Sequence, residues 1–365
     1  MGRRLRRCRE LWGESTLVEA RPALRIIEDA IYAPPDGAGR WGVFAGGQRI
    51  AGAGDGTSAS LPPPEPAPEA TYLFVGALAP HYGHFIVDTL ARLWPLLVWE
   101  GPRPRLLAFT PVPAGGADYA AAILGQLGVR PEDVSCFYQP MRLPRLLVPD
   151  PAFKEQAFVH RVFGDLCRAV GRSFWDGERL ERPVYLSKTR LSSGIARIAN
   201  EEAIVEELDR RGVEIVSPET LPFADQVRLF STHRIVMGST GSAFHTSAFA
   251  APGRRLIGLN WMPRLHANFA LIDGVSGHAA KYYFPVGTRY AAEGDTFHFG
   301  WLVRDPKQVA AELLARAEAF DRLDALDAEA EGLLATALDR AGDLAAELRD
   351  RIARHLRTAT ERLRP

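Results

Sequence analysis

A glycine-rich turn is the strongest chemical feature of this sequence. The turn follows the apolar residues 235–237 and consists of Gly238, Ser239, Thr240, Gly241 and Ser242. A hydrophobic strand, a turn of small residues and a helix together direct unpaired backbone N–H groups and the positive end of the helix dipole toward one point, which suits a phosphate or diphosphate. The alternative is a tight turn in which a serine or threonine only caps the helix. The segment therefore predicts a phosphate-binding turn.

Two histidines and a carboxylate form a second candidate segment. His81, His84 and Asp88 follow an apolar stretch at 72–75 and lead into a region of helical periodicity. His84 and Asp88 are four residues apart, so they share one helix face, where the carboxylate can fix the imidazole tautomer and raise its basicity. Such a pair suits a general base that takes a proton from an attacking hydroxyl group. The alternative is a polar pair that only ties the helix to its loop, and zinc lacks a third ligand at a diagnostic spacing.

A third segment is basic. The apolar residues 183–186 are followed by Ser187, Lys188, Arg190 and Arg197. In open α/β sheets ligands bind at the carboxyl ends of strands, and the planar arginine group matches phosphate oxygens. The alternative is a solvated basic loop, neutralised by the glutamates at positions 201, 202, 206 and 207.

These segments need a parallel sheet to bring them together. Strands are expected at 72–75, 105–109, 183–187, 213–216, 234–237 and 255–259. Helices are expected near 84–99, 119–127, 153–174, 200–211, 222–231 and from about 242. Strands that alternate with helices are typical of parallel sheets. The sequence thus predicts an α/β fold with two Rossmann-like units in tandem.

Composition divides the chain into four parts. Residues 1–70 predict a small β-rich region that ends in a proline-rich linker, because proline cannot donate to a strand ladder. Residues 71–180 and 181–305 are the two predicted Rossmann-like domains. Residues 306–365 predict an amphipathic helical extension that packs against the body or forms a homo-oligomer.

The overall composition excludes several classes. Basic and acidic residues balance at 44 each among 365 residues, so no global field points to nucleic acid. The three cysteines are far apart and are read as reduced thiols. No apolar stretch reaches the length of a membrane span or a signal-peptide core, which predicts a cytoplasmic protein. The arginine-rich start points to peripheral contact with the inner face of the membrane.

Taken together, four segments resemble glycosyltransferase family 61, including bacterial members of the capsular polysaccharide biosynthesis type. The segments are 82–94, 185–190, 223–230 and 238–253, within a likeness that runs from about 72 to 306. The resemblance implies a GT-B fold, in which two Rossmann-like domains face a cleft, with residues 71–180 on the acceptor side and residues 181–305 on the nucleotide-sugar donor side. It also implies a hexosyl- or pentosyltransferase that moves sugar from a nucleotide-sugar donor to a glycan or lipid-linked glycan. It further implies inversion of the anomeric configuration, without a cofactor and without an obligatory metal. The implied setting is the synthesis of capsule, lipopolysaccharide or exopolysaccharide.

The resemblance also implies roles for the candidate residues. Arg190 and the glycine-rich turn would stabilise the leaving nucleoside diphosphate, and the His84–Asp88 pair would come from the facing domain. Family members usually carry histidine where this chain has Thr240, so His245 is a candidate substitute; Asp225 replaces the usual glutamate. Two alternatives stay open, and the departure at Thr240 favours the first of them. One is a catalytically inactive carbohydrate- or nucleotide-binding relative, and the other is a GT-B-type nucleotide-sugar epimerase.

Overall fold

A computed structural model describes residues 4–35, 42–54, 62–110, 118–175, 177–291 and 297–329, together with positions 332, 341, 345 and 348. The chain divides into two compact units, Met1–Leu313 and Leu314–Pro365. The sheets and the candidate site described below lie in the first unit.

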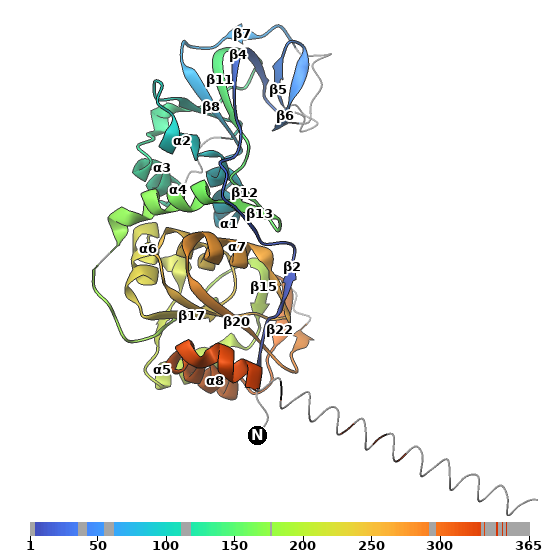
Figure 1. Ribbon diagram of the computed structural model, residues 1–365, viewed down its shortest axis with the longest axis vertical. Coiled ribbons are helices and arrows are strands. Elements are labelled where there is room, and N and C mark those ends of the chain that lie inside the picture. The colour runs from blue at the N-terminus through green and yellow to red at the C-terminus, as the bar shows by residue number, and fades with distance from the viewer. Residues whose placement is uncertain are drawn as a thin grey trace, which may run out of the picture. The chain divides into compact units, whose positions relative to one another are not determined.

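A six-stranded sheet forms the first framework (Figure 1). Its order is β1 (Leu5–Arg7), β20 (Ala279–Pro285), β18 (Arg255–Leu259), β17 (Ile235–Ser239), β14 (Val184–Leu186) and β16 (Glu214–Val216). All neighbouring strands are parallel except β1, which pairs with β20 antiparallel. The four strands predicted between 183 and 259 are confirmed. All residues of β14 are buried, and a strand covered on both faces has a continuous hydrophobic sequence. This explains why the strand could be predicted from the sequence.

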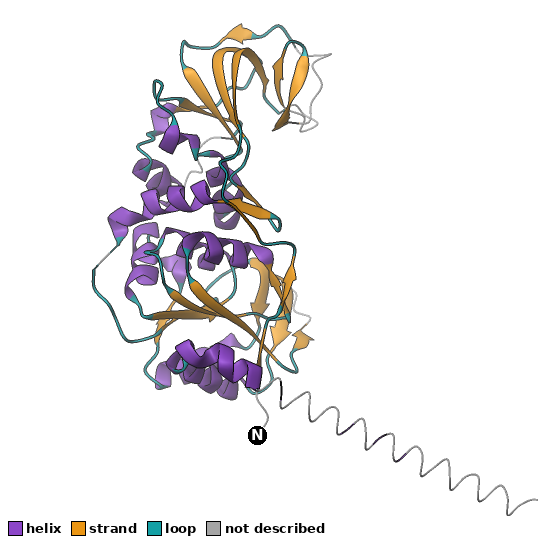
Figure 2. Cartoon of the chain, in the orientation of Figure 1, coloured by secondary structure: helices purple, strands orange, loops and turns teal. Residues whose placement is uncertain are grey.

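Helices cover this sheet on both faces (Figure 2). They are α5 (Glu201–Arg210), α6 (Phe223–Thr232), the 3-10 helix η7 (Ser242–Phe249) and α7 (Ala267–Ser276). The helix predicted from residue 242 is thus a 3-10 helix rather than an α-helix. Short 3-10 helices η5 (Arg172–Phe174) and η6 (Pro218–Thr220) complete the connections.

An eight-stranded sheet forms the second framework. Its main path is β10 (Val134–Ser135), β9 (Arg105–Ala108), β8 (Thr71–Gly76), β11 (Met141–Pro149), β4 (Leu24–Ala33), β5 (Gly42–Ala45) and β6 (Gln48–Gly54), with β7 (Glu65–Pro66) paired to β11. The pairs from β10 to β11 are parallel, and those from β11 to β6 are antiparallel. Strands from the predicted β-rich region therefore extend this sheet, whereas β1 joins the other one. The predicted domain boundaries themselves stay a prediction.

Three small sheets lie beside the two large ones. They are β12 (Phe153–Lys154) with β13 (Phe158–His160) and β3 (Thr16–Val18); β15 (Gly194–Ile198) with β22 (Phe297–Leu302) and β21 (Arg289–Ala291); and β19 (Arg264–His266) with β2 (Glu10–Trp12). The hairpin of β12 and β13 occupies the start of the helix predicted at 153–174. The observed helix, α4 (Arg161–Gly171), begins only after it.

The helix predicted near 84–99 is broken into four pieces. It consists of α1 (Tyr82–His84), the π-helical η2 (Phe85–Thr89), the 3-10 helix η3 (Leu90–Arg92) and α2 (Pro95–Val98). Pro95 begins α2, because proline fits the first turn of a helix but not its interior. The helix α3 (Asp118–Gln126) and the 3-10 helix η4 (Pro131–Asp133) follow.

One hydrophobic core joins the helices of both sheets. Phe85 and Phe163 from the N-terminal half pack in the same buried cluster as Phe223, Phe249 and Leu271 from the C-terminal half. The structure therefore confirms a mixed α/β fold, while the two-domain GT-B arrangement stays a prediction.

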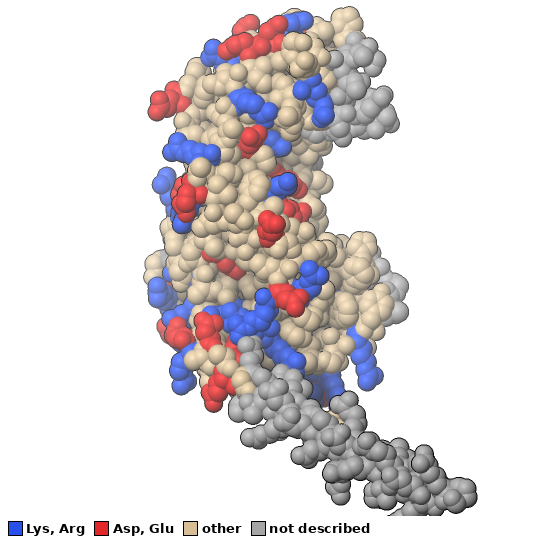
Figure 3. Space-filling model, turned by 45° about the vertical axis from the view of Figure 1, so that its right-hand side comes forward, with Lys and Arg blue, Asp and Glu red and all other residues tan. Residues whose placement is uncertain are grey.

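The C-terminal extension, the cysteines and the surface were also subjects of sequence-based predictions. The extension begins with α8 (Pro306–Glu318) and η8 (Phe320–Arg322), and most of it after residue 329, including the proposed oligomer surface, lies outside the described residues. No described helix has the length and apolar character to cross a membrane. The cysteines Cys8, Cys136 and Cys167 are free thiols. On the face in Figure 3, basic and acidic side chains are interspersed over much of the surface.

Candidate functional site

The carboxyl ends of β14 and β17 bring two predicted segments together. Leu186 at the end of β14 is the register partner of Gly238 in β17. A Cβ atom on Gly238 would lie 2.6 Å from the Leu186 carbonyl oxygen, which is closer than real Cβ contacts allow. Glycine is needed here so that the two strands can approach, and the glycine-rich turn is held directly beside the basic segment.

Lys188 is the cation at this turn. Its Nζ donates to the Thr240 carbonyl oxygen at 2.5 Å and lies 5.5 Å from the centroid of the Trp261 ring. A Cβ atom on Gly241 would lie 2.7 Å from Nζ, so the lysine head rests against the bare glycine backbone. Burial lowers the pKa of Lys188 to about 8, and the charge of Glu201 opposes this shift. Lys188 is therefore mostly protonated at neutral pH.

Glu201 fixes the basic segment through hydrogen bonds. Its side chain is 1% exposed and accepts hydrogen bonds from the Tyr185 hydroxyl at 2.9 Å and from the Lys188 backbone N–H at 3.2 Å. Burial raises the pKa of Glu201, and hydrogen bonds oppose that shift. Of the glutamates considered as neutralising groups, Glu201 contacts this segment, whereas Glu207 binds Arg210 and Arg211. Lys188 thus belongs to a built cluster rather than to a solvated loop.

Thr240 turns away from any ligand. Its side chain is fully buried, its hydroxyl donates to Asn260 Oδ1 at 2.8 Å, and its N–H donates to the Leu259 carbonyl oxygen at 3.0 Å. The threonine therefore fastens the turn after β17 to the turn after β18. It offers no hydroxyl to a phosphate.

The next two residues keep donors available. Within the described parts of the chain, the N–H groups of Gly241 and Ser242 have no hydrogen-bond acceptor. Ser242 is half-buried. The 3-10 helix that follows has poorer hydrogen-bond geometry than an α-helix. An anion at this turn would therefore meet local N–H groups and Lys188 more than a helix dipole.

His245 and Ser239 are buried beside the turn. Among the described residues, His245 Nδ1 has no hydrogen-bond partner, and the Ser239 hydroxyl lies close to Tyr185 and Glu201. Burial lowers the pKa of His245 to about 3, and the nearby His266, His81 and His84 lower it further. The ring is neutral at physiological pH. His245 therefore cannot supply the positive charge that a histidine at position 240 would offer.

The histidine segment lies against the same turn. A Cβ atom on Gly83 would lie 3.2 Å from Ser242 Cβ, and the Tyr82 hydroxyl and Thr246 Oγ1 form a 2.6 Å hydrogen bond. His84 Nδ1 and Asp88 Oδ2 are 3.0 Å apart, so the predicted pair forms. The three predicted segments therefore converge on one place.

The exposure of the His84–Asp88 pair bears on its role. The two side chains are 56% and 60% exposed. An exposed pair contributes at most about 1 kcal/mol to stability. A purely structural role, in which the pair ties the helix to its loop, therefore explains the pair only weakly. The ring of His81 lies 5.5 Å from that of His84, and burial, followed by the charge of His84, lowers the pKa of His81.

Three further residues were predicted to bind the donor, and each has its own surroundings. Arg190 is exposed and has no hydrogen bond or ion pair within the described chain. The guanidinium of Arg197, on β15, lies 5.1 Å from the centroid of the Phe297 ring. The Ser187 hydroxyl is hydrogen-bonded to that of Thr189 at 2.8 Å. Their part in donor binding stays a prediction.

Asn260 and Trp261 contribute to the site without having been predicted as site residues. Both directly follow β18, so the rule that selected the ends of β14 and β17 selects them too. Trp261 is half-buried beside Lys188. Tyr282 and Tyr283 are buried core residues. Nowhere in the described chain do three or more His, Cys, Asp or Glu side chains gather to hold a metal ion.

The fold and this cluster define an α/β protein with a cation and unpaired amides at the carboxyl edge of a parallel sheet. The family described as Glycosyltransferase 61 matches residues 82–257, and this match supports glycosyltransferase family 61 for the chain. The match contains His84, Lys188 and the glycine-rich turn. The match indicates glycosyltransferase activity. No match was found among curated proteins.

Proposed function

We propose that this glycosyltransferase moves a sugar from a nucleotide-sugar donor to a glycan or lipid-linked glycan acceptor, with inversion and without an obligatory metal. The observation that supports it is the meeting of the His84–Asp88 segment with the Gly241–Ser242 turn and Lys188. An acid–base pair and an anion-binding turn on facing elements are what a single displacement at a sugar phosphate requires.

On the donor side, the diphosphate would lie against Lys188 and the N–H groups of Gly241 and Ser242. These groups would stabilise the negative charge that develops on the leaving phosphate. The Lys188 ammonium is held in place by the Thr240 carbonyl oxygen and the Trp261 ring, so little reorganisation is needed. Arg190, two residues further on, is exposed and available to the same phosphates.

On the acceptor side, His84 would act as the general base. If Nδ1–H donates to Asp88, Nε2 carries the lone pair that takes the proton of the acceptor hydroxyl. That oxygen attacks the anomeric carbon while the bond from this carbon to the diphosphate oxygen breaks. The electron pair of the broken bond leaves with the nucleoside diphosphate, and one displacement inverts the anomeric configuration.

The biological setting is proposed from the family resemblance. We propose synthesis of capsule, lipopolysaccharide or exopolysaccharide at the cytoplasmic face of a membrane. At the arginine-rich start, Arg4 forms a 2.5 Å ion pair with Asp305, and the Arg7 guanidinium lies 5.6 Å from the Tyr283 ring centroid. These two arginines are engaged within the fold, so the start provides less support for membrane contact than its composition suggested.

A panel of nucleotide sugars tests the proposal, with NMR of the anomeric configuration and parallel reactions in excess chelator. Transfer that persists in chelator and inverts the configuration is the expected result. Binding without turnover would instead indicate an inactive relative, and interconversion of the donor sugar would indicate an epimerase. Strict dependence on a divalent metal, or retention of configuration, contradicts the proposal.

A further inference from the structure

A second basic cluster lies at the opposite edge of the six-stranded sheet. Arg234 directly precedes β17, and Arg254 and Arg255 stand at the start of β18. The strands are parallel, and Ile235 is the register partner of Arg255, so these arginines meet at the amino edge. The five residues of β17 put this edge roughly 13 Å from the glycine-rich turn.

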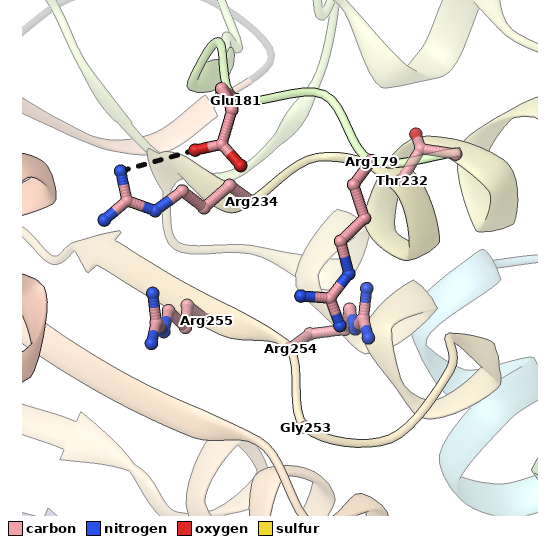
Figure 4. A pocket seen from close by; sticks show the side chains of 7 residues that line it. All are labelled: Arg179, Glu181, Thr232, Arg234, Gly253, Arg254 and Arg255. Atoms are coloured by element: carbon pink, nitrogen blue, oxygen red, sulfur yellow. Dashed lines mark ion pairs between the residues drawn. The ribbon is translucent and has the colours of Figure 1, made fainter. Parts of the chain in front are cut away.

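The arginines line a cavity of about 250 Å³ (Figure 4). Arg179 joins the three arginines of the strand edge, and Glu181 is the one acidic side chain among the described lining residues. Among the described lining residues, guanidinium groups outnumber carboxylates four to one. Glu181 lies 3.6 Å from Arg234, and both side chains are exposed, so this pair neutralises the cavity weakly.

Arg254 is fixed in place by carbonyl groups alone. Its Nη1 donates to the Ser231 carbonyl oxygen at 2.7 Å, and its Nε and Nη2 approach the Pro252 carbonyl oxygen at 3.4 and 3.3 Å. No carboxylate pairs with it in the described part of the chain. A guanidinium held this way is positioned before any ligand arrives.

Arg179 lies beside this fixed guanidinium. Figure 4 shows the two planar groups side by side, and burial together with the charge of Arg179 lowers the pKa of Arg254. Within the described residues Arg179 also has no acidic partner. Two adjacent like charges destabilise each other, and a bound anion would remove that cost. Arginine forks bind phosphate oxygens in a bidentate way, which favours a phosphate group over a monovalent ion.

We propose that this arginine pocket binds a phosphate group, carried by a small soluble phosphate or by an anionic lipid headgroup, at a site separate from the transfer site. The proposal does not depend on the donor, the acceptor or the general base. Calorimetric titration of the full chain with sodium pyrophosphate at low ionic strength tests the soluble source. Co-sedimentation with phosphatidylcholine vesicles that contain phosphatidic acid tests the lipid source.

The variants isolate the pocket from bulk charge. R179Q/R234Q removes two pocket arginines, and R142Q/R145Q removes the same charge from exposed side chains paired with Asp29 and Glu28 on the other sheet. We expect R179Q/R234Q to weaken pyrophosphate or vesicle binding by about tenfold or more, because charge-assisted hydrogen bonds are lost. We expect R142Q/R145Q to bind like the wild type. Thermal unfolding of all variants checks that each is folded.

The pyrophosphate titration and the vesicle co-sedimentation together distinguish the two sources of the phosphate group and test the proposal. Pocket-dependent binding of pyrophosphate indicates a soluble phosphate, and pocket-dependent binding of vesicles alone indicates a headgroup. The proposal is overturned if the wild type binds neither probe, or if both double variants weaken binding equally. It is also overturned if binding persists in R179Q/R234Q and disappears in Lys188→Met, which would place the ion in the transfer site.

Discussion

In the proposed transfer, Lys188 is the residue on which donor binding depends most. It is the charged group that touches the glycine-rich turn, through the Thr240 carbonyl oxygen and the open face of Gly241. Lys188→Met keeps most of the side-chain volume and removes the charge. We expect the donor Kd to rise by about 10- to 100-fold, the equivalent of a charge-assisted hydrogen bond. Calorimetric titration with the active nucleotide sugar measures it, and the exposed Lys154→Met is the matched control.

The pKa of Lys188 also predicts a pH dependence of donor binding. Burial lowers this pKa from 10.5 to about 8, so the ammonium is charged below pH 8 and becomes neutral above it. Binding of a diphosphate favours the charged form and moves the transition upward. Donor affinity should therefore fall as the pH rises from 8 to 10, whereas Lys188→Met should lack this fall. A wild-type Kd that is constant over this range would contradict the assignment.

At the scale of elements, two glycines of one turn should behave differently. A Cβ atom on Gly238 meets the Leu186 backbone, whereas one on Gly241 meets the flexible end of Lys188. We expect Gly238→Ala to lower the free energy of unfolding by about 1–3 kcal/mol, as overpacking does. Gly241→Ala should stay near wild-type stability but bind the donor more weakly, because Lys188 must move. Chemical denaturation and donor titration of both variants provide the test, and a reversed pattern would contradict it.

The elements also show what the sequence can predict. The strands β14, β17 and β18 were predictable because each is a short apolar run that ends at small or polar residues. The long strand β11 was missed because Pro144 interrupts it and its register depends on β4, over a hundred residues away. The π-helical η2 was also missed, because apolar spacing does not record a change of hydrogen-bond pattern.

Only part of the candidate site could be predicted from the sequence. The ends of parallel strands and the His84–Asp88 spacing could be read from the chain. The Thr240–Asn260 hydrogen bond and the burial of His245 could not, since both depend on packing between separate elements. Thr240 at the position of the usual histidine was the main doubt about this chain. In the structure this residue has a structural partner, and Lys188 provides the charge.

At the scale of the whole first unit, the shared core predicts cooperative unfolding. Phe163 of α4 is fully buried in the cluster that also holds Phe223 and Phe249. We expect Phe163→Ala to destabilise the unit by about 3–5 kcal/mol and both halves to unfold in one transition. Denaturant unfolding followed by far-UV circular dichroism and tryptophan fluorescence measures it. The exposed Tyr138→Ala should change stability by no more than about 0.5 kcal/mol; two separate transitions would contradict a shared core.

The most direct test of the transfer site compares donor binding with turnover in His84→Gln. The measurement is nucleoside diphosphate release in the presence of chelator and acceptor, with donor Kd from titration of the same samples. We expect His84→Gln to retain the wild-type Kd and to lose turnover by about 10²- to 10⁴-fold, the usual contribution of a general base. His298→Gln, at an exposed histidine on β22, should match the wild type. Wild-type turnover in His84→Gln would contradict the claim that the histidine segment and the glycine-rich turn form one transfer site.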